Sequence, residues 1–304
     1  MQPSFARYVL DDDEHRSSAE DTLSRLSGLD HEPFFQLRKE TASMTFKWFA
    51  ELWQFRELVY FLAWRDVKIR YKQAALGATW AVLQPLLTMA VFTIFFARLV
   101  GVPNDKVPYP LFSYSALLLW TYFAGVLAQG GQSLLSNSNL ITKVYFPRVA
   151  LPVSIALAGL LDFVVGLSFL VILMVYYRIH PRWTLLLVPM FVAGLVLFTL
   201  GVEMFLAAVN VRYRDIKYAV PFMIQLWLFV TPVIYPTAYL PERLQTLMAF
   251  NPLAGIIEGF RSCLFSGGSI NPVLTASSLS MAVLAFVAGL SYFCRAERTF
   301  ADVI

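Results

Sequence analysis

The sequence predicts an all-α integral membrane protein. We expect six transmembrane helices, with an amphipathic interface helix before the first and two short re-entrant helices before the last. Of the 304 residues, 58% are hydrophobic and only 14% are charged, whereas soluble domains carry about a quarter charged residues. This apolar excess is too large for one core to bury, so lipid must be the solvent for much of the surface.

The N-terminal residues 1–45 are polar and include an acidic run at 11–14. We expect a mobile cytoplasmic extension here, because so few apolar side chains cannot build a core. The first long apolar run begins only after the basic cluster at 65–72, which predicts an uncleaved chain without a signal peptide. The remaining residues, 46–304, are expected to form the transmembrane domain.

An interface helix is predicted over 46–72. Apolar side chains at Trp48, Leu52, Phe55 and Val59 recur at helical spacing, and the charged residues between them exclude a membrane span. Tryptophans favour the headgroup zone, so we expect this helix to lie in the plane of the membrane surface. A soluble helix docked on a partner is the alternative.

Six apolar runs are long enough to cross about 30 Å of hydrocarbon. The only acids within them are Asp162 in the third run and Glu203 in the fourth. The predicted spans cover about 73–100, 112–132, 149–177, 184–209, 218–240 and 272–294.

The stretch 241–266, between the last two spans, is apolar but is interrupted at Asn251-Pro252. Each half is too short to cross a bilayer. We therefore expect two short helices that enter the membrane and return on the same side. Such a backbone is tolerated only where it is buried in protein or lines a watery cavity.

The distribution of cations predicts that both termini face the cytoplasm. In that orientation the cytoplasmic ends of the spans carry more Lys and Arg than the outer ends, as the positive-inside rule requires. The cytoplasmic cations would be Arg65, Lys68, Arg70, Lys72, Lys143, Arg148, Arg212, Arg214, Lys217, Arg295 and Arg298.

Several chemistries lack the residues that they need. The sequence has no GxxxxGK[ST] phosphate-binding loop, so we do not expect this chain to bind ATP itself. Its three histidines are scattered, which leaves no zinc cluster, and no Ser-His-Asp set stands in a recognisable elbow. Cys263 and Cys294 are far from any CxxC spacing. We expect no catalytic residue, metal or cofactor in this chain.

The two acids inside predicted spans need a role. Asp162, near the middle of the third span, must face protein or water. It is either a pore or gate residue or the acceptor of a hydrogen bond between helices, and the sequence leaves both open. Glu203 lies near the cytoplasmic end of the fourth span, where Arg212 or Arg214 is the expected partner.

Aromatic side chains are abundant within the predicted spans. Sugar rings stack their CH faces on aromatic rings, so a row of such residues would let a glycan slide without being held tightly. The alternative for each ring is ordinary packing against lipid or another helix. Together with Asp162, the candidate residues of a glycan channel are Phe92, Phe95, Phe96, Trp120, Tyr122, Phe123, Trp227, Phe229 and Tyr235.

Four stretches of the sequence, taken in order, carry a family resemblance. They are residues 62–87, 139–152 ("NLITKVYFPRVALP"), 213–236 and 251–261. This arrangement resembles the ABC-2 type permeases that export polysaccharides and polyol phosphates, which are the membrane subunits of O-antigen, capsule and teichoic acid exporters. The resemblance runs from about residue 46 to the C-terminal end.

The resemblance implies a half-transporter of the bacterial cytoplasmic membrane that works as a homodimer. Two copies of a separate ABC ATPase subunit would bind it and would hold the ATP and magnesium. The expected substrate is a glycan or polyol-phosphate polymer carried on undecaprenyl pyrophosphate. Membrane lipid would surround the dimer, and nucleic acid is not an expected partner.

The resemblance also assigns roles to segments. The interface helix and a coupling helix over 133–148 would contact the ATPase, and the two short helices would form an outer gate region. The expected coupling residues are Trp53, Arg56, Asn139, Leu140, Ile141, Lys143, Val144, Phe146, Pro147 and Arg148. The expected gate residues are Asn251, Pro252, Glu258 and Arg261.

A polymer is far longer than a bilayer is thick, so one alternating-access cycle cannot carry it. We expect a continuous aromatic-lined channel between two permease halves, opened when closure of the ATPase displaces the coupling segments. The alternatives are an ABC-2 permease for a small molecule or lipid, a membrane-embedded glycan-modifying enzyme, and an ion channel or ion-coupled carrier. For the last of these the sequence offers no filter-like loop.

Overall fold

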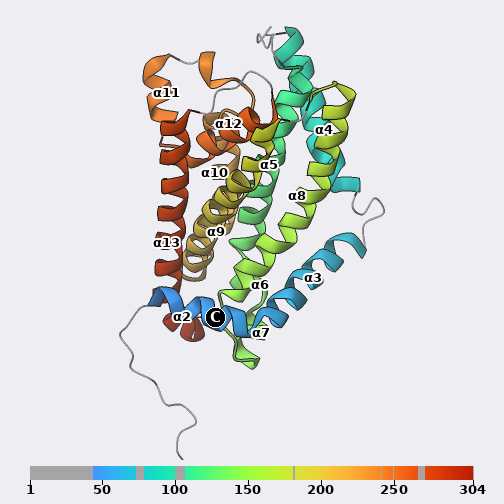
Figure 1. The fold of residues 1–304 in the computed structure, drawn as a ribbon. Coiled ribbons are helices and arrows are strands. Elements are labelled where there is room, and N and C mark those ends of the chain that lie inside the picture. The colour runs from blue at the N-terminus through green and yellow to red at the C-terminus, as the bar shows by residue number, and fades with distance from the viewer. Residues whose placement is uncertain are drawn as a thin grey trace, which may run out of the picture. The chain divides into compact units, whose positions relative to one another are not determined.

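The computed structural model describes residues 44–72, 79–99, 107–180, 182–239, 241–248, 250–265 and 271–303. Every regular element in these ranges is a helix, which confirms the predicted all-α fold (Figure 1). The residues from Met44 onward form one compact unit. The predicted extension, except for its last two residues, lies outside the described residues.

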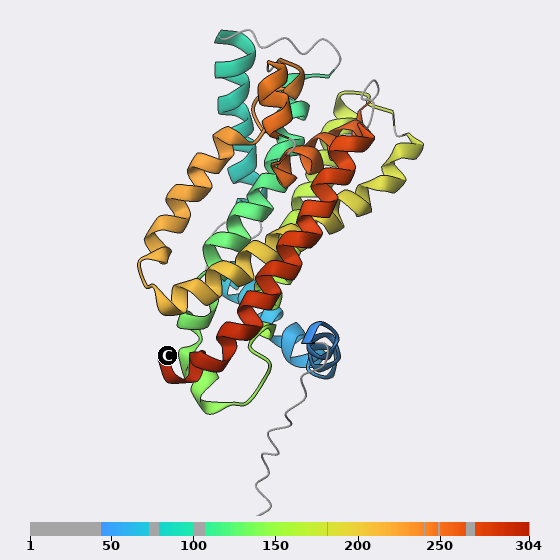
Figure 2. The same ribbon diagram turned by 90° about the vertical axis from the view of Figure 1, so that its left-hand side faces the viewer.

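Within the described residues, four helices are long and apolar enough to cross a membrane. They are α5 (Tyr109–Gly130), α8 (Ala150–Tyr176), α9 (Val188–Arg212), which follows the 3-10 turn η3 (Trp183–Leu187), and α13 (Pro272–Val303). These helices run side by side in both ribbon views (Figures 1 and 2). They correspond to the second, third, fourth and sixth predicted spans.

The first and fifth predicted spans contain shorter helices. In the first, α4 (Thr79–Phe92) continues into the π-helical η2 (Thr93–Leu99). In the fifth, α10 (Ile216–Val230) ends earlier than predicted, because Thr231 precedes a proline and adopts an extended conformation with φ −93° and ψ 139°. A continuous helix over 218–240 is therefore wrong, and a total of six spans stays a prediction.

The interface segment contains two helices rather than one, α2 (Met44–Gln54) and α3 (Arg56–Lys72). The predicted coupling helix is also divided, into α6 (Ser133–Ser136) and α7 (Ser138–Lys143). Helix α7 ends before Val144, which is extended. The reason is Pro147, which has no N–H to donate to the carbonyl of residue 143.

Two short helices precede the last span, as predicted, although their entry into the membrane stays a prediction. They are α11 (Glu242–Met248) and α12 (Pro252–Leu264), and the turn η4 (Thr237–Tyr239) lies before them. Asn251 caps α12 by accepting the Leu253 N–H at 3.2 Å. Every side chain of α12 except Glu258 is buried.

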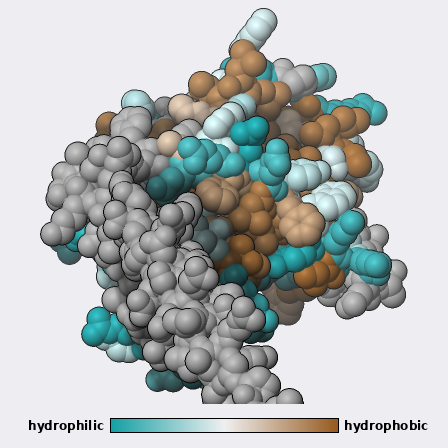
Figure 3. All heavy atoms as spheres, turned by 90° about the horizontal axis from the view of Figure 1, so that it is seen from below, coloured by the Kyte–Doolittle hydropathy of each residue, from teal (hydrophilic) through white to brown (hydrophobic). Residues whose placement is uncertain are grey.

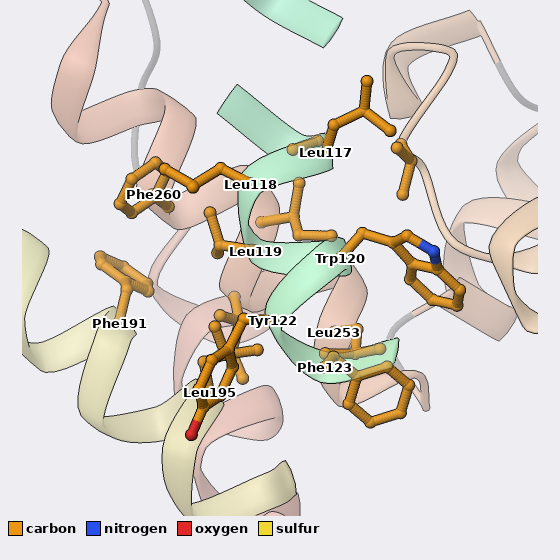
Figure 4. Close-up of a cluster of buried hydrophobic side chains, with 14 of the residues drawn as sticks. Leu117, Leu118, Leu119, Trp120, Tyr122, Phe123, Phe191, Leu195, Leu253 and Phe260 are labelled. Carbon is orange, nitrogen blue, oxygen red and sulfur yellow. The ribbon is translucent and has the colours of Figure 1, made fainter. Parts of the chain in front are cut away.

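The core lies around α5, where Leu119 faces Phe191 of α9 and Phe260 of α12, and Phe123 lies beside Leu253 of α12 (Figure 4). Helices α9 and α13 approach each other at their glycines. A Cβ atom on Gly289 would lie only 2.0 Å from the carbonyl oxygen of Gly201. Small residues at such a crossing let the two backbones come into contact. In a lipid environment the hydrophobic effect does not drive helices together, so they associate through close packing of this kind.

Candidate functional site

One end of the bundle gathers the predicted coupling segments. Helices α2, α6 and α7 and the C-terminal end of α13 lie together there in both ribbon views (Figures 1 and 2). We call this region the elbow end. In the view onto it, hydrophilic side chains border hydrophobic ones (Figure 3). A cleft of ≈ 950 Å³ opens between these segments, lined by Glu51, Gln54, Phe55, Ile141, Thr142, Lys143, Val144, Tyr145, Phe146, Pro147, Arg148, Cys294 and Glu297.

The elbow, residues 139–148, sends some side chains inward and others outward. Ile141 and Phe146 are buried in a core cluster with Val59 of α3, so Ile141 does not point outward as a contact for a partner would. Asn139, Lys143 and Val144 are exposed, and Leu140 and Pro147 are half-buried. Tyr145 is 85% exposed at the tip. Tyr145 was not predicted as a site residue, because no pattern in the sequence distinguishes it from its neighbours.

Arg148 ties the elbow to the C-terminal end of α13. Its backbone N–H donates to Glu297 Oε1 at 3.1 Å, and its guanidinium donates to the backbone carbonyl of Glu297. The same guanidinium lies 5.9 Å from the ring centroid of Phe300. Arg148 therefore holds the elbow and the C-terminal end of α13 together. Lys143 has no ion-pair partner among the described residues.

Helix α3 is bonded to the elbow region as well. Arg65 donates to the side-chain oxygen of Asn137 at 3.0 Å and pairs with Asp66 at 2.8 Å. At the junction with α2, Arg56 donates to the carbonyl of Trp53 at 3.3 Å and lies 5.7 Å from its ring centroid. Trp53 and Arg56, two predicted coupling residues, are both exposed.

Asp162, the acid within α8, is bonded by the last turns of α3. Arg70 pairs with one carboxylate oxygen and the Tyr71 hydroxyl donates to the other. Arg70 also donates to Gln129 Oε1 of α5 at 2.7 Å. Of the two roles left open for Asp162, the structure shows the hydrogen bond between helices. The cluster joins α3, α5 and α8.

The partners of Asp162 were not found from the sequence, where Arg70 counted only as a cytoplasmic cation and Tyr71 had no role. Arg70 and Asp162 are 92 positions apart in the chain, so no local pattern connects them. Partial burial raises the pKa of the Tyr71 hydroxyl, while the neighbouring Arg70 charge acts in the opposite direction. Tyr71 thus keeps its proton at neutral pH and remains a donor to Asp162.

The predicted channel aromatics fall into two groups. Trp120, Tyr122 and Phe123 are buried in the core. Phe123 stacks on Phe198 at a centroid distance of 5.6 Å and meets the edge of Trp227 at 5.2 Å. In this single chain those rings pack against protein.

The other group lies nearer the surface. Phe95 of η2 and Phe229 of α10 are 55% and 60% exposed. Phe92 and Phe96 are half-buried and pack edge to face at 5.8 Å. Half-buried Tyr235 donates to the carbonyl of Phe229 at 3.1 Å. The structure does not bring all the predicted aromatics together in one row.

The predicted gate residues hold the segment that follows α10. Thr237 donates to Glu258 Oε1 at 2.7 Å, and Asn251 donates to the Thr231 hydroxyl at 3.0 Å. Pro252 begins α12 and is buried. Arg261 is buried as well and donates to carbonyl oxygens on both sides of α12, those of Phe112, Pro232 and Val233 at 2.8–2.9 Å. These residues fasten residues 231–237 to α5 and α12.

Glu203 does not pair with Arg212 or Arg214, so that expectation is wrong. Its side chain is fully buried, and neither carboxyl oxygen has a hydrogen-bond partner among the described residues. It packs against Gly130, where an added Cβ atom would lie 1.9 Å from Glu203 Oε1. The described part of the chain contains no group of three or more His, Cys, Asp and Glu side chains that could hold a metal ion.

Comparison with known proteins adds to this geometry. Residues 57–265 match the ABC-2 type transporter family. The chain is 32% identical over 260 residues to the O-antigen export system permease protein RfbA of Myxococcus xanthus, covering 84% of this chain and 98% of the relative. It is 29% identical over 243 residues to a Klebsiella pneumoniae protein of the same name, covering 79% and 92%. The polysialic acid transport protein KpsM of Escherichia coli is 20% identical over 210 residues, covering 67% and 79%.

Proposed function

The chain belongs to the ABC-2 type transporter family, and on that premise we propose that it is the transmembrane subunit of an ATP-driven polysaccharide exporter. The observation that carries the proposal is its similarity, over nearly the full length of the relative, to an O-antigen export permease. The cargo would be an O-antigen-like, capsular or polyol-phosphate polymer on undecaprenyl pyrophosphate. The protein would lie in the cytoplasmic membrane of a bacterium with both termini in the cytoplasm.

A homodimer would complete the transport path. Helix α10 has a single buried residue, Val220, while Phe222 and Phe229 are each 60% exposed. An apolar groove of ≈ 480 Å³ separates α10 from α5 and α9 and includes Leu127 and Leu206 in its lining. A second copy packed against α4 and α10 would cover these side chains. The exposed rings Phe95 and Phe229 would then lie near the junction of the two copies, where the channel is expected.

The ATPase would dock at the elbow end. An interface needs exposed anchors, and aromatic and arginine side chains dominate the energy of most interfaces. The elbow end offers Trp53, Arg56 and Tyr145 as exposed anchors, with Lys143 two residues before Tyr145. The elbow itself is bonded to α13 through Arg148. Two ATPase copies, one for each permease chain, would hold the nucleotide and magnesium.

The contacts of α3 suggest how ATPase closure reaches the membrane part. Displacement of α2 and the elbow would move α3, because Arg65 of α3 is bonded to Asn137, two residues before the elbow. The last turns of α3 grip Asp162 of α8 and Gln129 of α5. A rigid-body movement of α3 would therefore shift two candidate spans together and change the path between the two copies.

Reconstitution of the complex tests this proposal. The permease and its ATPase subunit are placed in vesicles whose membrane contains a lipid-linked polysaccharide. ATP is added outside, and the polysaccharide that becomes protected inside the vesicles is measured over time. We expect transfer that needs ATP hydrolysis and fails in the Asp162→Ala variant while the complex remains assembled. Transfer of a small lipid but not of the polymer would support the alternative permease function and contradict the proposal. Transfer without ATP would contradict an ATP-driven exporter of any kind.

A further inference from the structure

The outer face of α3 has a composition that the proposed function does not explain. Val59, Leu62 and Val67 are buried against the rest of the protein, as one apolar face of a docked helix should be. A second set of apolar side chains points away from the bundle. Phe61 and Ile69 are 64% and 62% exposed. A helix with two apolar faces needs a second apolar environment besides the protein core.

Two lysines share this outer face. Lys68 and Lys72 follow Trp64 at intervals of four residues, so all three lie along one side of the helix. The Lys68 ammonium is 5.9 Å from the ring centroid of Trp64. Neither lysine has a carboxylate partner among the described residues, whereas Arg65 beside them is already bound to Asp66. The face therefore combines apolar side chains with two uncompensated positive charges.

The position of α3 along α8 places these lysines beside the membrane. Arg70 and Tyr71, in the same turns, bond Asp162, which lies twelve residues after the first residue of α8. At 1.5 Å per residue this is about 18 Å along that helix. The end of α3 is therefore well advanced along a membrane-crossing helix. Lysines beside such a helix need either a route to water or an anionic partner.

Two grooves meet at Trp64. The first, of ≈ 390 Å³, separates α3 from α8 and includes Val59, Tyr60, Val153 and Leu157 in its largely apolar lining. The second, of ≈ 320 Å³, is lined by Phe61, Trp64, Arg65, Lys68, Ile69 and Lys72. An apolar groove for a hydrocarbon chain thus adjoins a second groove whose lining residues include the two lysines that could contact a phosphate. That is the arrangement of groups in a phospholipid.

We propose that the outer face of α3 binds an anionic glycerophospholipid of the surrounding leaflet. Its phosphate contacts Lys68 and Lys72, and an acyl chain lies in the groove between α3 and α8. A permanently exposed face is occupied by the lipid that is abundant around it, which points to bulk phospholipid rather than to a scarce carrier lipid. Basic residues near a membrane gain from anionic lipids in this way. This site is independent of the transported cargo.

Native mass spectrometry of the purified full chain tests the proposal. The protein, in a neutral detergent, is titrated with phosphatidylglycerol and separately with phosphatidylcholine, and the bound lipids are counted. We expect tighter binding of phosphatidylglycerol and an affinity about 25-fold weaker in the Lys68→Gln, Lys72→Gln double variant, since each lysine contributes about five-fold. The Lys68→Arg, Lys72→Arg variant keeps both charges and should bind like the original protein.

The matched control is Lys217→Gln at the first turn of α10. Lys217 is also exposed and also lies over an aromatic ring, 4.8 Å from the centroid of Tyr218. We expect its loss to leave the affinity within about two-fold of the original. Equal binding of the two phospholipids would overturn the proposal, as would equal affinity of the double glutamine variant. Displacement of phosphatidylglycerol by a far lower concentration of a polyprenyl pyrophosphate would assign the face to a carrier lipid and overturn it too.

Discussion

The two ends of the bundle both use buried or half-buried arginines, but they use them differently. On the side of the elbow end, Arg148 reaches across to Glu297, and farther along α8 Arg70 pairs with Asp162 and remains in contact with solvent. At the opposite end, which we call the α12 end, Arg261 is 7% exposed and bonds backbone carbonyls. Hydrogen bonds that are partly exposed can be replaced by bonds to water at a small cost in free energy. The buried bonds of Arg261 have no water to replace them, so breaking them costs more. The difference indicates a movable elbow end and a fixed α12 end.

The largest effect is expected for Arg261→Ala. The change leaves the carbonyl oxygens of Pro232 and Val233 buried without the Arg261 donor, while the Phe112 carbonyl keeps the Ser115 hydroxyl as a donor. Buried groups that lose a charged donor cost about 1–3 kcal/mol each, so we expect a loss of about 2–6 kcal/mol in the free energy of unfolding. Thermal unfolding in detergent measures it. Arg243→Ala, at an exposed position of α11, is the control and should change little. Equal melting of the two variants would remove the proposed contrast between the ends.

A backbone contact at the α12 end gives the next effect. A Cβ atom on Gly255 would lie 2.1 Å from Ser278 Oγ and 2.8 Å from the carbonyl oxygen of Leu274. We expect Gly255→Ala to lower stability by about 2 kcal/mol through overpacking. Gly125→Ala is the matched control in α5, because nothing lies within 4 Å of the added atom. That change should be neutral or should stabilise the protein by up to about 1 kcal/mol. A stable Gly255→Ala variant would show that α12 and α13 can separate.

The pair Arg70 and Asp162, which joins α3 to α8, is expected to contribute less. A double-mutant cycle with Arg70→Ala and Asp162→Ala should give an interaction energy of about 1–2 kcal/mol, because both side chains keep contact with solvent. The cycle is read from chemical unfolding of the purified protein. An interaction energy above about 4 kcal/mol would mean that this pair holds its helices as strongly as the Arg261 contacts hold the α12 end. An interaction near zero would leave α3 without its proposed grip on α8.

The smallest effect is expected at Arg178. Its backbone conformation is unfavourable for a residue other than glycine, so the α12 end also contains a position that is not optimal for stability. Arg178 follows the last turn of α8 with φ 57°, the left-handed conformation that favours glycine. Ile179 donates its N–H back to the carbonyl of Met174 at 2.9 Å. We expect Arg178→Gly to raise stability by about 0.5–1 kcal/mol, measured as a higher melting temperature. A lower melting temperature would mean that the Arg178 side chain makes a stabilising contact.

The helical elements could be predicted because apolar run length and proline position determine them locally. The predicted span over 112–132 differs from α5 by only two or three residues at each end. The two short helices on either side of Asn251 were also predicted, since Asn251-Pro252 interrupts an apolar stretch whose halves are too short to cross a bilayer. The predicted end of α10 was wrong, although Pro232 was the signal that could have corrected it.

The contacts between elements could not be predicted in the same way. A cation count places Arg70 on one side of a membrane, but it does not say that the side chain reaches Asp162 in another helix. Helical periodicity did not show that Ile141 turns inward and that Tyr145 is exposed, because the elbow is too short and irregular for a pattern. Glu203 was assigned a partner from sequence distance alone, and tertiary packing separates it from that partner.

The most direct test of the account is affinity purification of the tagged chain from gently solubilised membranes. Stoichiometric recovery of an ABC ATPase is expected with the original protein. The Tyr145→Ala variant should lose it by more than ten-fold, as expected for an interface anchor, while its melting temperature stays unchanged. Tyr176→Ala, which removes a tyrosine of similar exposure at the other end of α8, should retain the ATPase. Purification of the original chain without any ATPase, or equal recovery with both tyrosine variants, would contradict the assignment of the elbow end as the coupling site.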